Sequence, residues 1–294
     1  MDIANLRAFV AVAESQSFSA AATQLHLTQP AISKRIATLE TGFQTRLFDR
    51  IGRAVDLTEA GRALLPRARR ILAELDDSRR ALADLSGTVG GTLRLGTSHH
   101  IGLHRLPPTL RTFAARYPAV TLDLHFMDSE AACHAVETGD LELAIVTLPP
   151  EAHGPLDLQP VWDDPLVVVC APDHPLAQRR RMQIADLAAH PAILPASSTY
   201  TRQIAERAFH DLGIGLRSSL STNYLEIIKM LVSVGLGWSL LPQTMVDRQL
   251  HMLPVRDLRL RRTLGTVRHR ERTLSNAARA MIELLPVPTH TASR

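Results

Sequence analysis

Residues 18–57 constrain the fold of this chain most, because they read as two short helices, a tight turn and then a hairpin. The second helix is predicted to begin after Thr28, whose hydroxyl can accept a hydrogen bond from a free N–H of the first turn, where Pro30 is tolerated. Apolar side chains then recur at steps of four, three and four residues, as Ile32, Ile36, Leu39 and Phe43. This spacing predicts a helix with one buried face.

The opposite face of this helix is short-chained, polar and basic. It carries Pro30, Ser33, Lys34 and Thr41, with Gln29 at its N-terminal end. Such a face suits a helix that enters the major groove of DNA N-terminus first. An ordinary amphipathic helix that shows its polar face to water is the alternative that periodicity leaves open.

Four stretches of the N-terminal region resemble the LysR-type transcriptional regulators. They are LRAFVAVAESQSFSAAA from Leu6 to Ala22, LTQPAISKRIATLE from Leu27 to Glu40, LFDR from Leu47 to Arg50, and LTEAG from Leu57 to Gly61. The stretches occur in the order of the family, nearly without gaps, over residues 1–65. The resemblance implies a winged helix-turn-helix DNA-binding domain over residues 1–58.

The resemblance also implies which residues meet DNA. These are Gln29, Pro30, Ser33, Lys34, Arg50 and Arg53. Arg53 is expected to insert from the wing near the minor groove, and Gly52 suits a wing turn that needs positive φ. A dimer would then bind a dyad-symmetric promoter site with half-sites about one duplex turn apart.

Charge and composition agree with a DNA-binding protein without proving one. The chain has 294 residues, of which 45% are hydrophobic, and is long enough for two or three globular units. Its formal net charge is +4, and residues 1–70 hold ten Lys and Arg against six Asp and Glu. No run approaches about 20 consecutive apolar residues, and no basic N-terminal region precedes an apolar one. We therefore expect a soluble, cytoplasmic protein with no membrane partner.

Residues 58–86 are predicted to form one long helix after Thr58, kinked near its start by Pro66. Small and apolar side chains recur there in a seven-residue pattern, as Leu64, Ala68, Ile71, Leu75, Ser78, Leu82 and Leu85. The stripe could pack on its own domain, but the resemblance implies a linker helix over residues 59–87 through which dimers form. The implied dimer contacts are Leu64, Ala68, Ile71, Leu75 and Leu82. A flexible hinge is expected at residues 86–91.

The remaining residues alternate short apolar runs with helical patterns, which predicts an α/β fold with βαβ units and a mostly parallel sheet. The expected strands are 93–96, 121–126, 143–146, 166–170, 192–194, 218–221 and 237–240. The expected helices are 104–116, 130–138, 201–212, 224–234 and 273–285.

Three phrases in this region resemble the effector domain of the same family. They are GTLRLG from Gly91, GDLELAIV from Gly139 and DHPLA from Asp173. The resemblance implies a two-lobed domain over residues 88–294, similar to a periplasmic binding protein, with a ligand cleft between the lobes. Lobe I would hold residues 91–161 and 267–294, and lobe II residues 162–266. The crossovers are expected near residues 160–165 and 262–268.

Polar loops at the carboxyl ends of the expected strands are candidates for the ligand site. They contain Thr97, Ser98, His99 and His100, then Asp128 and Ser129, then Thr147, and in the other lobe Ser197, Ser198 and Thr199. Their hydroxyls and backbone N–H groups suit a small anion or carboxylate, although Ser and Thr at helix starts are most often plain caps. The resemblance implies effector contacts in the first and last of these loops. Modulation by such an effector is therefore the expected function.

His100 and His104 raise a metal-sensor alternative, because their spacing puts two imidazoles on one helical face. No cysteine or carboxylate lies nearby in sequence to complete a site, so we expect no metal and no cofactor. A histidine that binds an anionic effector, or a surface histidine, is the favoured interpretation.

Two cysteines are too few for a disulfide framework. Some relatives sense oxidants with a cysteine pair, so a redox-responsive regulator is an alternative. Cys133 lies in a helical pattern and Cys170 ends a strand-like run, which favours structural burial.

Enzyme functions find no support, because the chain has no nucleophile elbow, no phosphate-cradling glycine loop and no HExxH pattern. A solute-binding protein would need an export signal, and this function would leave residues 1–57 unexplained. The partners implied by the resemblance are double-stranded promoter DNA, a small-molecule effector, further copies of the chain in a dimer or tetramer, and RNA polymerase.

Overall fold

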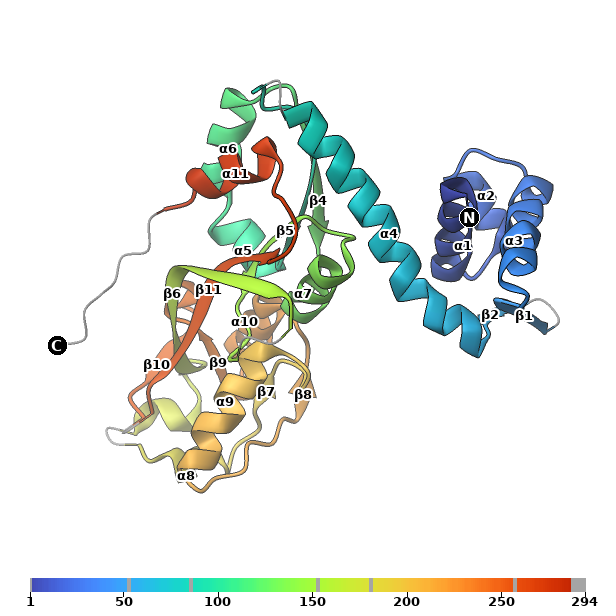
Figure 1. Ribbon diagram of the computed structural model, residues 1–294. Coiled ribbons are helices and arrows are strands. Elements are labelled where there is room, and N and C mark those ends of the chain that lie inside the picture. Colours follow the sequence, from blue (N-terminus) through green and yellow to red (C-terminus); the bar gives the residue numbers. More distant parts are fainter. Residues whose placement is uncertain are drawn as a thin grey trace. The chain divides into compact units, whose positions relative to one another are not determined.

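The computed structural model describes residues 2–51, 54–84, 87–151, 154–179, 182–255 and 258–286 (Figure 1). The chain divides near residue 86 into two compact units, each with its own hydrophobic core. None of the helices within the described ranges combines the length and the apolar character needed to cross a lipid bilayer.

The smaller unit begins with three short helices. They are α1 (Ile3–Ser15), α2 (Phe18–Gln24) and α3 (Gln29–Phe43). Each starts at a side chain that accepts a backbone N–H bond: Asp2, Ser17 and Thr28. As predicted, Ile32, Ile36 and Leu39 turn inward and pack with α1. Phe43 was expected to join them and does not, because it lies in the last turn of α3 and is 44% exposed.

A two-stranded wing follows, made of β1 (Phe48–Ile51) and β2 (Ala54–Leu57). The strands are antiparallel, and Ile51 pairs with Ala54 at their far end. Glu40 of α3 anchors the near end, because its Oε1 accepts a hydrogen bond from the Leu47 backbone N–H at 2.8 Å. Helix and wing are therefore held to each other.

The long helix α4 (Glu59–Asp84) is capped by Thr58, whose hydroxyl accepts from the Gly61 N–H at 3.0 Å. Gly61 has to be glycine-sized, because an added Cβ would collide with the Leu47 carbonyl oxygen. The helix continues through Pro66; a kink there stays a prediction.

The residues of the expected dimer stripe on α4 differ in burial, and dimer formation through them stays a prediction. Ala68 has no exposed surface, and Leu64 packs beside it against the core of the smaller unit. These two residues therefore serve the chain's own domain, whereas Ile71 is 38% and Leu82 71% exposed. Leu85 lies outside the described residues.

The larger unit is built on a seven-stranded mixed sheet. Its strands are β3 (Gly91–Thr97), β4 (Val120–Phe126), β5 (Leu143–Thr147), β6 (Leu156–Cys170), β9 (Ser239–Pro242), β10 (His251–Leu253) and β11 (Leu260–His269). The order is β10-β6-β11-β5-β3-β4, with β9 also paired to β6. Only β3 with β4 and β3 with β5 are parallel in this sheet. The expectation of a mostly parallel sheet was wrong, because β6 and β11 run antiparallel to each other and to the neighbours they pair with.

Helices cover the two ends of this sheet separately and form two lobes (Figure 1). Lobe I carries α5 (His99–His104), α6 (Pro107–Arg116), α7 (Ser129–Thr138) and α11 (Asn276–Glu283). Lobe II carries α8 (Ile184–Leu187), α9 (Tyr200–Asp211), α10 (Leu225–Ser233), the parallel pair β7 (Ile193–Leu194) and β8 (Leu220–Ser221), and the 3₁₀ turns η1 (Pro175–Gln178) and η2 (Gln243–Met245).

The crossovers are the long strands β6 and β11, which pair antiparallel from Leu156 to Leu166. The register shifts at Gly265, where an added Cβ would collide with the Gln159 carbonyl oxygen. The expected strand 166–170 is thus only the last third of β6. The expected helix 104–116 begins three residues later, as α6, because Pro107 and Pro108 occupy its first turn, and the short helix α5 before it ends at His104.

Candidate DNA-binding surface and effector cleft

The reading face predicted for α3 lies on the surface. Gln29, Pro30 and Lys34 are exposed and Ser33 is half-buried. The Gln29 amide donates to the Ser33 hydroxyl at 3.5 Å, a weak contact that a base edge could replace. Arg35 is different, because its guanidinium reaches back to the Ala4 carbonyl oxygen. The wing places Arg50 in β1 opposite Val55, and Arg53 lies outside the described residues.

A small cavity of about 50 Å³ lies between the two lobes, where β3, β4 and β5 end. Seven of the predicted effector residues line it: Ser98, His99, His100, Asp128, Ser129, Thr147 and Thr199. Four different loops and two lobes therefore converge on one cleft.

Three predicted effector residues do not line this cavity. Thr97 is buried in β3, and its hydroxyl donates to the Ile145 carbonyl oxygen at 2.8 Å. Ser197 and Ser198 are exposed on the loop before α9. Thr97 therefore stabilises the sheet, and the two serines point elsewhere than the cleft.

Arg262 is the main lining residue that sequence reasoning missed. This guanidinium is 4% exposed, donates to Asp164 Oδ2 at 2.7 Å and to the Thr201 hydroxyl at 3.1 Å, and keeps one NH₂ group without a partner among the described residues. Burial lowers the pKa of Arg262, an effect that Asp164 opposes. Its only sequence signal was its place in the expected second crossover. The other missed lining residues are Glu130, Pro195, Thr201, Asn223 and Leu225.

The hydroxyls of the cleft differ in what they already bind. Thr199 caps α9, where its Oγ1 accepts from the Arg202 N–H at 3.2 Å and donates to the Ala196 carbonyl. Ser129 accepts from the Thr147 N–H at 3.2 Å. Ser98 precedes α5, but its side chain makes no capping bond. Ser98 is therefore the hydroxyl most available to a ligand.

Hydrogen bonds across the cleft hold the two lobes together. The Asn223 amide donates to Asp128 Oδ2 at 2.7 Å, and the Tyr200 backbone N–H donates to Glu130 Oε1. Burial raises the pKa of Glu130. Both acidic groups of the cleft are thus engaged by donors from lobe II.

A cluster of two histidines and one glutamate lies beside this cleft. His104 Nε2 is 3.0 Å and His100 Nδ1 is 3.6 Å from Glu226 Oε1. Burial lowers the pKa of His100, while the neighbouring His100 ring is the largest cause that lowers the pKa of Glu226 to about 2. No local sequence pattern pointed to the carboxylate, since Glu226 is 122 residues from His104.

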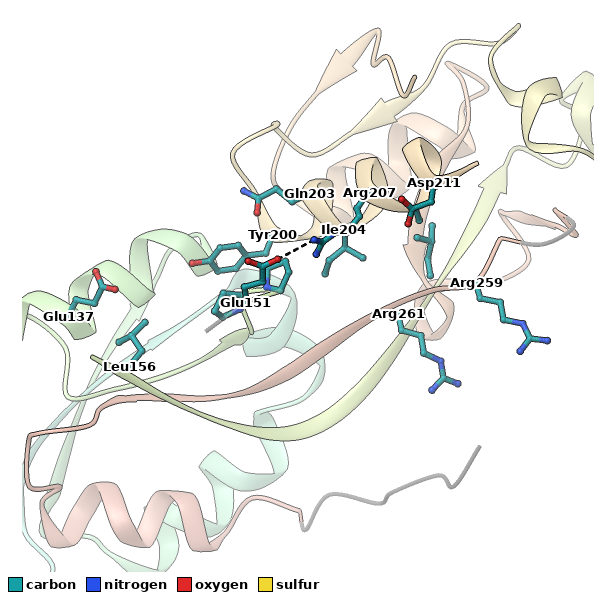
Figure 2. Close-up of a pocket in the computed structure, with 14 residues that line it drawn as sticks. Glu137, Glu151, Leu156, Tyr200, Gln203, Ile204, Arg207, Asp211, Arg259 and Arg261 are labelled. Carbon is teal, nitrogen blue, oxygen red and sulfur yellow. Dashed lines mark hydrogen bonds and ion pairs between the residues drawn. The ribbon is translucent and has the colours of Figure 1, made fainter. Parts of the chain in front are cut away.

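A larger pocket of about 700 Å³ opens between α9, the loop at Pro149–Glu151 and the two crossover strands (Figure 2). Figure 2 shows Arg207 directed at Glu151, and these groups are 3.1 Å apart. Arg259 and Arg261 extend away from α9, and Arg261 binds Asp163 at 2.7 Å. Arg207 and Arg261 are exposed and already paired, whereas the Arg262 NH₂ group in the smaller cleft is buried without a partner among the described residues, so the smaller cleft is the better anion site.

Cys133 and Cys170 are both buried, in the cores of different lobes. A disulfide requires Cα atoms within about 7 Å. Placement in two separate cores argues against a disulfide switch and agrees with the predicted structural role.

Two family models match the chain. The model described as "Bacterial regulatory helix-turn-helix protein, lysR family" matches residues 3–62, and the "LysR substrate binding domain" matches residues 86–286. The chain belongs to the LysR family. This LysR-family protein is therefore a DNA-binding transcriptional regulator with an effector-binding domain, and not an enzyme.

Curated relatives agree with this assignment. The LysR-family chain is 32% identical to a "Probable RuBisCO transcriptional regulator" from Synechocystis sp., over 96% of this chain and 85% of the relative. It is 31% identical to the "RuBisCO operon transcriptional regulator" of Allochromatium vinosum, over 97% and 95%. A stretch of 108 residues is 70% identical to an uncharacterised regulator of Azotobacter vinelandii, covering 37% of this chain and 75% of that one.

Solved LysR-family structures share the fold. A full-length OxyR variant from Pseudomonas aeruginosa superposes with a TM-score of 0.73 at 22% identity, over 97% of this chain and 94% of that one. Full-length CbnR complexed with its target DNA gives 0.66 at 22% identity, over 97% and 99%. The predicted winged helix-turn-helix and binding-protein-like fold is confirmed.

Proposed function

We propose that this regulator binds a small carboxylate or inorganic anion in the cleft between the lobes, and that binding changes its action at promoter DNA. The observation that carries the proposal is the buried Arg262 NH₂ group, which lines the cleft and has no hydrogen-bond partner within the described part of the chain. A buried N–H donor that makes no hydrogen bond destabilises the fold, and an anionic oxygen would provide the missing acceptor.

The chemistry around Arg262 supports an anion of limited size. Ser98 offers a hydroxyl that no cap uses, and the acids Asp128 and Glu130 already accept bonds from lobe II. A cavity of about 50 Å³ is far below the volume of drug-sized ligand sites. The favoured effector is therefore an inorganic oxyanion or a short carboxylate, unless the lobes open.

Promoter DNA is the second ligand. We propose that Gln29, Pro30, Ser33 and Lys34 reach base edges or the adjoining phosphates, with Arg50 and Arg53 supporting them from the wing. The exposed polar N-terminal half of α3 supports this arrangement.

For assembly, we propose a dimer through the outward side of α4 and a tetramer through the effector-binding domains. RNA polymerase is the expected partner at the promoter.

A ligand screen on the full chain tests the effector proposal. Inorganic anions and short carboxylates are added one by one, and thermal unfolding is measured; a ligand at 100 times its dissociation constant adds about 2.7 kcal/mol of stability. Ser98→Ala should weaken binding of the effective anion by roughly tenfold to hundredfold, since a hydrogen bond to a charged group is worth about 1.5–3 kcal/mol.

Ser197→Ala is the matched control, because that exposed serine lies outside the cleft and should leave binding unchanged. Equal stabilisation of wild type and Ser98→Ala, or an absence of response to every anion, would count against the site.

A further inference from the structure

We propose that His100, His104 and Glu226 form a site for one divalent transition-metal ion of the zinc type, which ties the two lobes together. The three potential ligand atoms lie within 4.8 Å of one another. The proposal does not rest on the effector, because the ion binds protein groups alone.

Local structure brings the three groups into position. His100 and His104 lie one turn apart in α5, with ring centroids 4.9 Å apart, so both imidazoles share one face. Glu226 lies in the first turn of α10, in the other lobe. One of the protein's ligands therefore comes from a different lobe than the other two.

The distances from Glu226 to the two histidines are close to those of a bound ion. In a tetrahedral zinc site with bonds of about 2.0–2.1 Å, neighbouring ligand atoms are about 3.3–3.5 Å apart. The two contacts of Glu226 Oε1 are 3.0 Å and 3.6 Å, on either side of that value.

His100 is the observation that points to a ligand. It is 4% exposed, and neither ring nitrogen has a hydrogen-bond partner among the described residues. His100 Nδ1 lies 3.6 Å from Glu226 Oε1, too far for a hydrogen bond, and a buried imidazole without one is unusual, because nearly all buried polar side chains are satisfied. A metal ion would provide the missing partner.

The donor set decides the class of ion. Two imidazoles and one carboxylate suit Zn²⁺ and its neighbours in the first transition row, and they leave further coordination positions to water or an anion. Mg²⁺ prefers oxygen ligands and keeps its waters, so it fits poorly. The nearby charge of Arg262 is opposed by Asp164, which binds that arginine at 2.7 Å and Arg105 at 3.0 Å.

A metal titration of the full chain, stripped with a chelator and free of any affinity tag, tests the site. Calorimetry should detect one Zn²⁺ per chain, and Co²⁺ should develop visible absorption as imidazole nitrogens bind it. His104→Gln and Glu226→Gln, which change partly exposed side chains, should each weaken Zn²⁺ at least about 100-fold, since even the loss of an outer-shell partner costs 10- to 100-fold. Zn²⁺ should raise the Tm of wild type, and Mg²⁺ should not.

His134→Gln is the matched control, because His134 lies 3.6 Å from Glu137 as a surface histidine–carboxylate pair on α7. It should leave the single tight site intact. The proposal is overturned if wild type shows no saturable one-to-one binding, or if either His104→Gln or Glu226→Gln retains it. An anion response that persists in these two variants would show that the effector cleft works without the metal.

Discussion

Asp163 and Asp164 are neighbours on β6, and each pairs with an arginine of β11, yet their surroundings differ. Asp164 is fully buried and accepts hydrogen bonds from Arg262 and Arg105. Asp163 binds Arg261 at 2.7 Å on the exposed side of the same strand. The two neighbouring carboxylates thus differ in burial and in their partners, because Asp164 binds two arginines and Asp163 one.

We expect Asp164→Asn to lower the free energy of unfolding by about 3–5 kcal/mol, because the charge of Arg262 would stay buried without its counter-ion. Asp163→Asn should cost only about 0–1 kcal/mol, as exposed ion pairs do. Urea unfolding of the full chain measures both values. Similar losses in the two variants would refute the assigned role of burial.

The thiols of Cys133 and Cys170 should be inert near neutral pH, because burial raises the pKa of each to about 11. A thiol-specific reagent at pH 8 should leave the folded protein unmodified and label both residues after unfolding in urea. Rapid modification of either thiol in the folded protein would restore the redox-sensor alternative.

The raised pKa values of the two thiols also predict how the free energy of unfolding changes with pH. In the unfolded chain the two thiols have their ordinary pKa of 9.0, so they ionise at a lower pH than in the folded protein. The unfolded state therefore releases protons first, and this contribution to stability is complete below pH 9 and lost as the pH rises toward 11.

At the level of elements, α3 is expected to read DNA with its N-terminal half. If Lys34 contacts a base, Lys34→Ala should weaken binding to the dyad-symmetric site by about 1–3 kcal/mol. If Lys34 contacts only a phosphate, the loss should be smaller and the affinity should depend less on salt. Fluorescence anisotropy at two salt concentrations separates these outcomes. Arg70→Ala removes an equal charge from the exposed surface of α4 and serves as control. Equal affinities of both variants would remove Lys34 from the interface.

Elements specified by neighbouring residues were predictable from sequence. Thr28 caps α3 and Thr58 caps α4 as expected, because both use bonds to N–H groups three residues ahead. The helix expected over 104–116 starts at Pro107 instead, because Pro107 and Pro108 occupy the first turn of α6, a position that proline tolerates.

Contacts between distant residues could not be predicted from spacing. Arg262 meets Asp164 across 98 residues, and Glu226 meets His104 across 122. The strand pairing and lobe arrangement that bring them together are not encoded by any local pattern. The hydroxyl loops of the cleft were found because strand ends are readable locally, whereas their charged partners were not.

At the level of the whole molecule, both proposed ligands act on the contact between the lobes. The anion would bind groups of both lobes in the cleft, and the metal ion would join α5 to α10. Each ligand shifts the equilibrium between open and closed lobes only by its difference in affinity for the two states. Two ligands that both bind the closed lobes more tightly than the open ones would each strengthen binding of the other.

Assembly is expected to depend on the part of α4 that the chain leaves exposed. Ala68 is buried in the chain's own core with Leu64 packed against it, so the exposed Ile71 and Leu82, with the half-buried Leu75, remain for a partner helix. Ile71→Glu combined with Leu82→Glu should yield monomers, because burying each side chain contributes roughly 1.5–3 kcal/mol and a carboxylate in that seam reverses it. Sedimentation velocity of the full chain measures the change.

Leu212→Glu, which changes an exposed leucine at the end of α9, is the control and should leave assembly intact. Monomers should also lose affinity for a two-half-site operator while keeping weak binding to single half-sites. An intact oligomer in the double variant would place the interface elsewhere than α4.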